Sequence, residues 1–341
     1  MKDKNKSGAA KRSPAKSAKT EDRSAAADSV GERIAKRIAR AGLCSRRDAE
    51  RWINDGRVRV NGKVLKTPAC VVTGKDRIEV DGEPLPAKER TRLWLHHKKS
   101  GLVTTSRDPE GRTTVFESLP DDLPRVLSVG RLDINTEGLL LLTNDGGLAR
   151  ALELPSTGWL RRYRVRAHGS VTQERLDELK EGIAVDGVLY GAIDAELERQ
   201  QGGNVWLTFA MREGKNREVK NVLGALGLEV NRLIRLSYGP FQLGDLDPGQ
   251  VREVRGRTLR DQLGAKLIEQ SGANFDTPLA AEPDRSKKQK KASKPQKLRA
   301  KRQQVDPLSR LDTKRPPAAN EKSRRRGSQA ARTKRNADRR R

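Results

Sequence analysis

The two ends of this chain lack the apolar side chains from which a folded core is built. Residues 1–31 and the residues from 284 onward contain no aromatic residue and very few large aliphatic ones. Such segments cannot bury enough surface to offset the conformational entropy that is lost on folding. They also hold most of the charge, +4 and +18 of a formal net charge of +27. We therefore expect disordered basic arms at residues 1–31 and 273–341, with the folded structure between them.

Composition also restricts the partners and the compartment. Lysine and arginine runs in the arms favour sequence-independent attraction to the phosphates of RNA, and a solubilising tail without a defined partner is the alternative. The two cysteines, Cys44 and Cys70, fit a reducing compartment, and no cysteines and histidines are spaced like metal ligands. No apolar run is long enough for a signal peptide or a membrane span. These features predict a cytoplasmic monomer with no metal and no membrane contact.

Residues 32–86 predict a compact unit of helix, helix, strand, turn and strand. Ile34 and Ile38 lie four residues apart, which indicates a short amphipathic helix. Ser45 followed by Asp48 is the pattern of a capping box at the start of a second helix. The strands are expected at residues 58–60 and 77–80, with a hairpin turn at Asn61 and Gly62.

The polar side of this unit is unusually basic, and we interpret it as an RNA-binding face. Cations in the first turn of a helix oppose the helix dipole unless an anion neutralises them, and phosphate is such an anion. A solvated charged face is the alternative interpretation. The residues concerned are Arg46, Arg47, Arg51, Arg57, Arg59 and Lys63.

After a linker that contains Pro84 and Pro86, residues 87–272 alternate between strand and helix patterns. This order predicts an α+β domain on a mixed, mainly antiparallel sheet. The expected strands lie at residues 93–97, 102–105, 138–143, 163–167, 205–211 and 233–237. The expected helices lie at residues 172–181, 216–226 and 258–270.

A short polar loop at residues 130–138 is followed by the longest apolar run of the chain, residues 139–142. Gly130 and Gly138 allow tight backbone geometry at the ends of the loop, and the apolar run predicts a fully buried strand that anchors it. Asp133 lies inside the loop beside Arg131, where a carboxylate with a perturbed pKa is expected. From these residues alone, Asp133 is equally well a catalytic group or an aspartate that caps a turn.

The loop resembles the aspartate motif of the RsuA/RluB family of ribosomal RNA pseudouridine synthases, G-R-L-D-x-x-T-x-G-L, at every fixed position. Residues 45–50 and 58–62 are similar to the ribosomal-protein-S4-like RNA-binding domain that precedes the catalytic domain in that family. Residues 213–220 and 233–236 resemble its later motifs, and residues 108–112 and 154–159 resemble its large-subunit, RluB-like branch. The resemblance implies an S4-like domain at residues 32–86 and a pseudouridine synthase domain at residues 87–272.

The resemblance implies an enzyme that converts a specific uridine of ribosomal RNA, in large-subunit 23S RNA or its precursor particles, into pseudouridine. The N1–C1′ bond breaks and the uracil reattaches through C5, with no metal, nucleotide or redox cofactor. Asp133 matches the essential carboxylate, and both covalent addition to the nucleoside and removal of a ribose proton stay open. The alternatives are a small-subunit synthase and a non-catalytic RNA-binding or ribosome-assembly protein, which has no need for a carboxylate in a site that receives RNA.

Four further residues receive roles from the same resemblance. Tyr163 matches a tyrosine that stacks on the target base, with a plain strand core residue as the alternative. Lys215 stands where the family has a basic residue that pairs with the catalytic aspartate, and Arg217 competes for that role. Both are alternatively phosphate ligands. Arg131 is expected to contact the flipped nucleotide or to brace the loop.

One position departs from the family pattern. The family usually has Lys-Pro in its first motif, and here Lys98 is followed by Lys99. Proline would only stiffen the loop, so we expect a looser loop, an active enzyme and a weaker case for a fixed role of Lys98. His96 and His97 lie in an expected strand, where at least one points into the sheet as a structural histidine rather than an acid–base catalyst.

Overall fold

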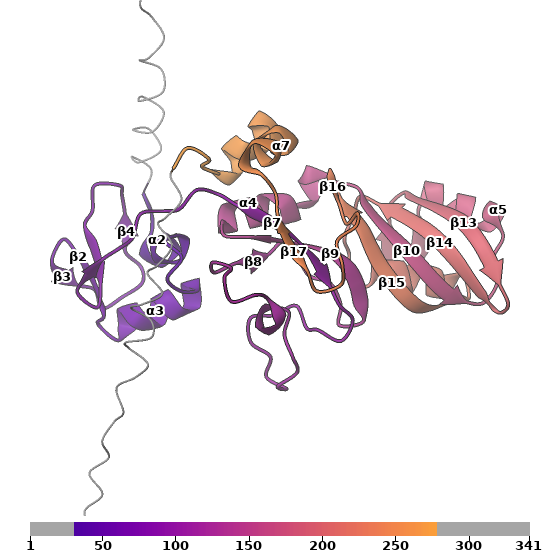
Figure 1. The fold of residues 1–341 in the computed structure, drawn as a ribbon, viewed down its shortest axis with the longest axis horizontal. Helices are drawn as coiled ribbons and strands as arrows, with labels where there is room; N and C mark the ends of the chain where they lie inside the picture. The colour runs from indigo at the N-terminus through magenta and orange to yellow at the C-terminus, as the bar shows by residue number, and fades with distance from the viewer. Residues whose placement is uncertain (1–30, 278–341) are drawn as a thin grey trace, which may run out of the picture. The chain divides into compact units, whose positions relative to one another are not determined.

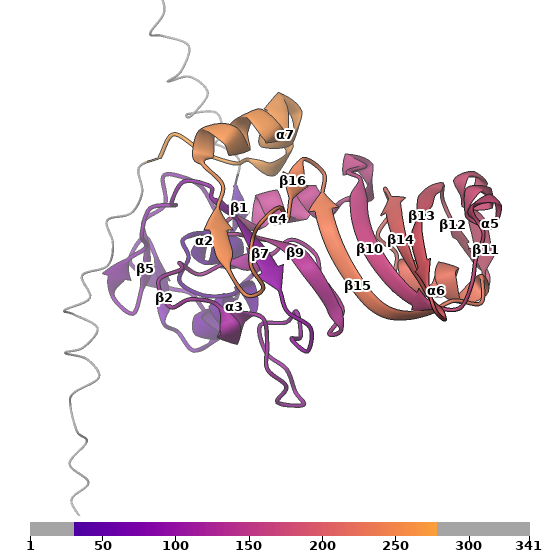
Figure 2. The same ribbon diagram turned by 45° about the vertical axis from the view of Figure 1, so that its right-hand side comes forward.

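The computed structural model describes residues 31–277 of the chain (Figures 1 and 2). The basic arms predicted at residues 1–31 and 273–341 lie almost entirely outside that range. At the inner end of the second arm, the backbone N of Asn274 donates to Thr91 Oγ1 (3.0 Å), and Phe275 packs against a buried cluster. The packed structure therefore continues for a few residues beyond the boundary predicted at residue 272.

The N-terminal unit has the predicted two helices and short antiparallel strands. Its capping box is confirmed, because Asp48 N donates to Ser45 Oγ (3.1 Å) and Ser45 N donates to Asp48 Oδ2 (3.4 Å). One sheet has the strand order β3-β2-β5-β6, and β1 pairs with β4. The elements are β1 (Glu32–Arg33), α2 (Ile34–Arg40), α3 (Arg46–Asn54), β2 (Val58–Val60), β3 (Lys63–Val64), β4 (Val71–Val72), β5 (Ile78–Val80) and β6 (Glu83–Pro84).

Tight turns of one kind set the register of this small sheet. Asn61 and Gly62 join β2 to β3 with φ of 50° and 79°, and Asp81 and Gly82 join β5 to β6 with φ of 53° and 84°. Positive φ at both central residues is what a type I′ hairpin turn requires, and Asn-Gly and Asp-Gly meet it most readily. The hairpin predicted at Asn61 is confirmed.

The rest of the described chain builds a mixed sheet of nine strands (Figure 1). The order is β13-β14-β10-β15-β9-β7-β17, with β8 and β16 paired to β9 and β15. Within this sheet, over the described residues, β9 and β15 form the parallel pair and all other pairs are antiparallel, which confirms the predicted sheet type. The strands are β7 (Leu93–Lys98), β8 (Leu127–Ser128), β9 (Thr136–Thr143), β10 (Arg161–His168), β13 (Ile193–Gln201), β14 (Asn204–Met211), β15 (Glu229–Tyr238), β16 (Phe241–Gln242) and β17 (Val251–Glu253).

The predicted helices are present, with shifted ends. The helix expected at residues 216–226 starts later because Arg217 has a left-handed backbone, with φ of 49°. The segment 172–181 divides into an α-helix and a 3₁₀ turn, and the last helix is interrupted at Gly264, where φ is 68°. These elements are α5 (Gln173–Asp177), η3 (Glu178–Glu181), α6 (Glu218–Ala225) and α7 (Gly256–Ser271), and the structure adds α4 (Gly146–Glu153), which was not predicted.

Several strands of the second region differ from the prediction. The strand predicted at residues 102–105 is wrong, because Val103 makes a single bridge to Thr114 and the hydroxyl of Thr104 donates to Leu132 O (2.8 Å). This segment bonds to neighbouring loops instead of joining a ladder. The hairpin of β11 (Ile183–Val185) and β12 (Val188–Tyr190), the strand β13 and the short strands β8, β16 and β17 were not predicted. The second half of β13 is almost entirely charged or amide, which hides its strand pattern.

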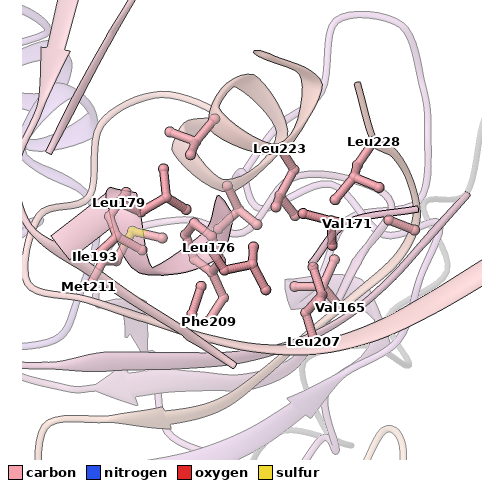
Figure 3. Packing of buried hydrophobic residues seen from close by; sticks show 14 of the residues in the cluster. Val165, Val171, Leu176, Leu179, Ile193, Leu207, Phe209, Met211, Leu223 and Leu228 are labelled. Carbon is pink, nitrogen blue, oxygen red and sulfur yellow. The ribbon is translucent and has the colours of Figure 1, made fainter. Parts of the chain in front are cut away.

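The apolar run that follows the polar loop is buried on both faces of the sheet. Leu139 and Leu141 pack in a cluster with α4 and α7, whereas Leu140 and Leu142 pack on the opposite face, and none of the four is exposed. Under the other half of the sheet, side chains of β10, β13 and β14 meet α5 and α6 (Figure 3). Each buried leucine contributes about 1.5–3 kcal/mol relative to exposure. The loop before β9 is therefore attached to a strand that is fully buried in the hydrophobic core.

Candidate active site

A cleft of about 390 Å³ opens beside the loop that precedes β9. Its walls come from this loop, from α4, from β10, β15 and the end of β14, and from the segment before and within α6. The five residues predicted for the active site all line it: Arg131, Asp133, Tyr163, Lys215 and Arg217. The lining carries seven cationic side chains and three carboxylates, so it favours an anionic ligand.

The backbone around Asp133 is held at both ends of its loop. Thr136 N donates to Asp133 O (3.0 Å), and Val129 N donates to Leu141 O (2.8 Å). Gly138 has φ of 100°, and a Cβ there would lie 2.3 Å from Arg235 O. Glycine is thus required because β15 passes directly against the loop's end. The half-buried carboxylate of Asp133 projects from a short, braced loop into the cleft.

Lys98 supports the loop that carries Asp133, although the absence of the family's proline had weakened the case for a fixed role of this lysine. Its side chain is fully buried, and Nζ donates to Lys99 O (3.0 Å), Ile134 O (3.0 Å) and Thr136 O (2.9 Å). Burial lowers the pKa of Lys98 to about 8, and the negative charges of Asp133 and Glu137 oppose that shift. The ammonium ties the end of β7 to the residues on either side of Asp133. The missing proline is therefore no argument against a fixed role for this lysine.

Tyr163 is both part of the sheet and part of the cleft wall, and its expected stacking on the target base stays a prediction. It lies on β10 between Phe209 of β14 and Arg235 of β15, is half-buried, and packs against the cluster shown in Figure 3. It also lines the cleft. An aromatic ring fixed on one edge by a sheet core and open on the other is suited to receive a planar base.

Lys215 lines the cleft but does not pair with Asp133 in this structure. Its Nζ donates to Glu213 Oε2 (2.6 Å) and to Leu189 O (2.5 Å). Its backbone N donates to Glu218 Oε2 (2.8 Å), which fixes the turn before α6. Burial raises the pKa of Glu218. The pairing expected from the resemblance requires Lys215 to leave Glu213.

Two buried arginines of the cleft were missed by the sequence analysis. The Arg161 guanidinium donates to Arg212 O, to Glu213 O (3.2 Å) and to the Tyr238 hydroxyl (3.0 Å). Arg235 Nε donates to Leu139 O (2.7 Å), while its buried Nη2 has no partner among residues 31–277. Both occupy inward positions of strands, where the alternation calls for apolar residues. An arginine at an inward strand position is the sequence signal that could have identified both residues.

The prediction that at least one of the two histidines near the loop points into the sheet is confirmed by His96. His96 is fully buried on β7 with Nδ1 at 3.1 Å from Gln250 O, and burial lowers its pKa to about 4. His97 Nδ1 lies 2.7 Å from Leu246 O. Neither lines the cleft.

The basic residues predicted to bind RNA gather on the N-terminal unit. Arg46, Arg47, Arg51, Arg59 and Lys63 are all exposed, on α3 and on the β2–β3 hairpin. Arg51 pairs with Asp48. Arg57 is instead engaged with Asp81 (2.8 and 2.5 Å) and stacks over Trp52, which makes it a structural cation.

Neither metal binding nor membrane spanning has a candidate within residues 31–277. No three side chains of His, Cys, Asp or Glu in this range gather as a metal site would need. No helix in the same range combines the length and the apolar character needed to cross a bilayer.

Comparison with known proteins identifies both regions. Residues 32–78 match the S4 domain, and residues 92–225 match the RNA pseudouridylate synthase family. An uncharacterized RNA pseudouridine synthase of Rickettsia felis is 45% identical over 228 residues, which cover 67% of this chain and 99% of that protein. Ribosomal large subunit pseudouridine synthase B of Pseudomonas aeruginosa is 38% identical over 315 residues, 89% of this chain and 77% of that protein.

Among solved structures, a pseudouridylate synthase crystal structure matches with a TM-score of 0.48 and 28% identity, over 68% of this chain and 99% of that one. The sequence relatives and the two matched domains decide the assignment. The chain belongs to the S4-domain-containing RNA pseudouridine synthases and is an enzyme.

Proposed function

We propose that this enzyme isomerises a specific uridine of large-subunit ribosomal RNA to pseudouridine, with Asp133 as its catalytic carboxylate. The RNA class is supported by relatives from Pseudomonas aeruginosa and Yersinia pestis, 38% and 40% identical, that are named ribosomal large subunit pseudouridine synthase B. The small-subunit RNA is the competing substrate.

The observation that carries the proposal is the cleft that holds Asp133 and Tyr163 together. A uridine turned out of the RNA would place its uracil against the Tyr163 ring, with its C1′ side toward the carboxylate. Asp133 then either adds to the nucleoside or removes a ribose proton, and the freed uracil reattaches through C5. Substrate and product are isomers, so the reaction needs no electron carrier and no second reactant.

The cationic residues around the cleft support binding rather than bond breaking. Arg131 and Arg217 are exposed at the cleft and available to the phosphates that flank the target. Lys215 pairs with Asp133 and keeps it ionised once bound RNA draws it away from Glu213. The exposed arginines of α3 hold the RNA at a distance from the chemistry, as non-specific phosphate ligands.

The test is Asp133→Asn, which keeps the shape of the side chain and removes its charge. Purified wild type and variant are each given unmodified 23S and 16S transcripts, and pseudouridines are mapped chemically. Wild type forms pseudouridine at one 23S site, while the variant binds the same RNA and loses at least about a thousandfold in rate. The matched control is Asp245→Asn, an exposed aspartate paired with Arg252, which keeps full activity.

Each part of the proposal has its own contradictory outcome. A fully active Asp133→Asn enzyme rules out the catalytic role of that carboxylate. Modification of the 16S transcript alone overturns the choice of large-subunit RNA and leaves the chemistry intact.

A further inference from the structure

A second groove, of about 370 Å³, adjoins the candidate active-site cleft. Four of its nine lining residues carry hydroxyl groups and one is aromatic, and we call it the hydroxyl groove. The residues that distinguish it from the cleft are Thr104, Thr105, Ser106, Phe116, Leu127 and Ser128. They come from the segment 102–116, which was wrongly predicted as partly strand, and from β8.

The hydroxyl groove is continuous with the cleft. Gly130, Arg131 and Glu153 line both spaces. Gly130 N donates to Glu153 Oε1 (2.8 Å), so this shared wall is a fixed feature of the fold. The floor of the groove is also tied to the catalytic loop, because the buried Thr104 hydroxyl donates to Leu132 O (2.8 Å), next to Asp133.

The side chains that line the groove are better suited to bind a nucleoside than to bind phosphate groups. Ser106 and Ser128 place hydroxyl-bearing side chains along the groove. Phe116 is half-buried and offers a ring for stacking. Hydroxyls can read base edges and a ribose 2′-OH, while the exposed Arg131 at the junction can meet the phosphate between two nucleotides.

We propose that the hydroxyl groove holds the nucleotide that adjoins the target uridine in the RNA, with its base on Phe116. This inference rests on the proposed function: with the target in the cleft, its neighbour is tethered to it and reaches the adjoining groove across the shared wall at Arg131. The occupant is thus part of the same RNA strand. Its fit helps to select which uridine is modified.

The test is a double-mutant cycle in which one change is made in the RNA and the other in the protein, and kcat/KM is measured for each combination. The substrate is a 23S fragment around the uridine mapped for wild type, either intact or with an abasic site on one side of that uridine. On one of the two sides, the abasic site lowers kcat/KM of wild type about tenfold, the range expected for one stacked base. Phe116→Leu lowers kcat/KM on intact RNA similarly, and it adds little further loss on the abasic RNA.

A packing control separates stacking from general damage. Leu102→Ala removes a side chain that packs against the same buried cluster as Phe116 without lining the groove. This variant has lower thermal stability but keeps the tenfold response to the abasic site. Ser106→Ala keeps the ring, and its loss of about threefold on intact RNA also shrinks when the neighbouring base is absent.

The outcomes distinguish this inference from the proposed function. If wild type pseudouridylates RNA but neither abasic site affects it, or if the losses multiply for Phe116→Leu and for Ser106→Ala, the groove does not bind the neighbour. If wild type forms no pseudouridine in any ribosomal transcript, the proposed function itself fails.

Discussion

At the scale of single residues, the carboxylate that carries the proposed chemistry is positioned by a buried lysine that does not line the cleft. Lys98 holds the carbonyls of Ile134 and Thr136, so one buried ammonium defines the path of the backbone around Asp133. Sequence reasoning located Asp133 through its motif but could not assign Lys98, because its partners are backbone atoms 36 and 38 residues away. Lys215 shows the same limit: its position in the cleft was predictable, its engagement with Glu213 was not.

Replacing Lys98 with Met should loosen the Asp133 loop. The change removes a donor from three carbonyls, although Ile134 O keeps its hydrogen bond from Gly101 N (2.8 Å), and it costs about 1–3 kcal/mol of unfolding free energy. We expect kcat to fall about 10–100-fold because the carboxylate loses its position. Urea unfolding and single-turnover rates measure the two effects, with Lys99→Met, an exposed neighbour, as control. A variant as stable and active as wild type would show that the three hydrogen bonds contribute nothing.

The same lysine gives wild type a specific pH dependence. Its pKa is about 8 in the folded protein, against 10.5 for an unburied lysine. Between these values the unfolded chain holds a proton that the folded chain has released, so the stability contributed by Lys98 rises with pH across this window. Relative to Lys98→Met, wild type should therefore gain about 1 kcal/mol between about pH 7 and pH 9. An unchanged difference means that Lys98 does not titrate there.

At the scale of elements, the sequence predicted helices and strands correctly where a local motif or a strong apolar pattern determines them. The capping box at Ser45 and the apolar run at residues 139–142 are local or strongly patterned, and both were predicted correctly. Strand β13 was missed although Ile193, Ala195 and Leu197 alternate with acidic residues, because the charged and amide residues that follow hide this short pattern. The parallel pairing of β9 with β15 likewise depends on tertiary structure and could not be predicted from local sequence. Gly138, where the two strands approach most closely, is the residue that this pairing requires.

Gly138→Ala should test that contact directly. A Cβ at this position would lie 2.3 Å from Arg235 O and 2.7 Å from Arg235 N, so the two strands must separate. We expect a loss of about 2–4 kcal/mol in unfolding free energy, measured with urea. Gly130→Ala is the matched control, because its φ of 66° is also positive but a Cβ there meets nothing within 4 Å. That control should lose only about 1–2 kcal/mol. Equal losses would show that φ, not the approach of β15, selects glycine at both positions.

At the scale of the whole molecule, charge and chemistry are separated along the chain. The segments outside residues 32–283 hold +22 of the +27 net charge, whereas the cleft lies entirely between Val129 and Tyr238. Binding strength and site choice should accordingly respond to different changes. Two further surfaces are proposed to contact the RNA. The exposed arginines of α3 would contribute to binding strength through phosphates, and the hydroxyl groove would contribute to site choice through the neighbouring nucleotide.

Deletion of residues 284–341 should therefore weaken RNA binding without slowing the chemical step. This segment carries +18, and neutralised phosphates release counterions, so its contribution falls steeply as salt rises. We expect a loss of at least about tenfold in affinity at about 50 mM salt and less than about threefold at about 300 mM. Single-turnover rates at saturating RNA should match those of the full chain. As control, Arg46→Gln with Arg47→Gln should lower affinity less, since it removes only two charges, and should likewise leave the saturated rate unchanged. A truncated enzyme that binds normally but turns over slowly would place the arm in the catalytic step and contradict this separation.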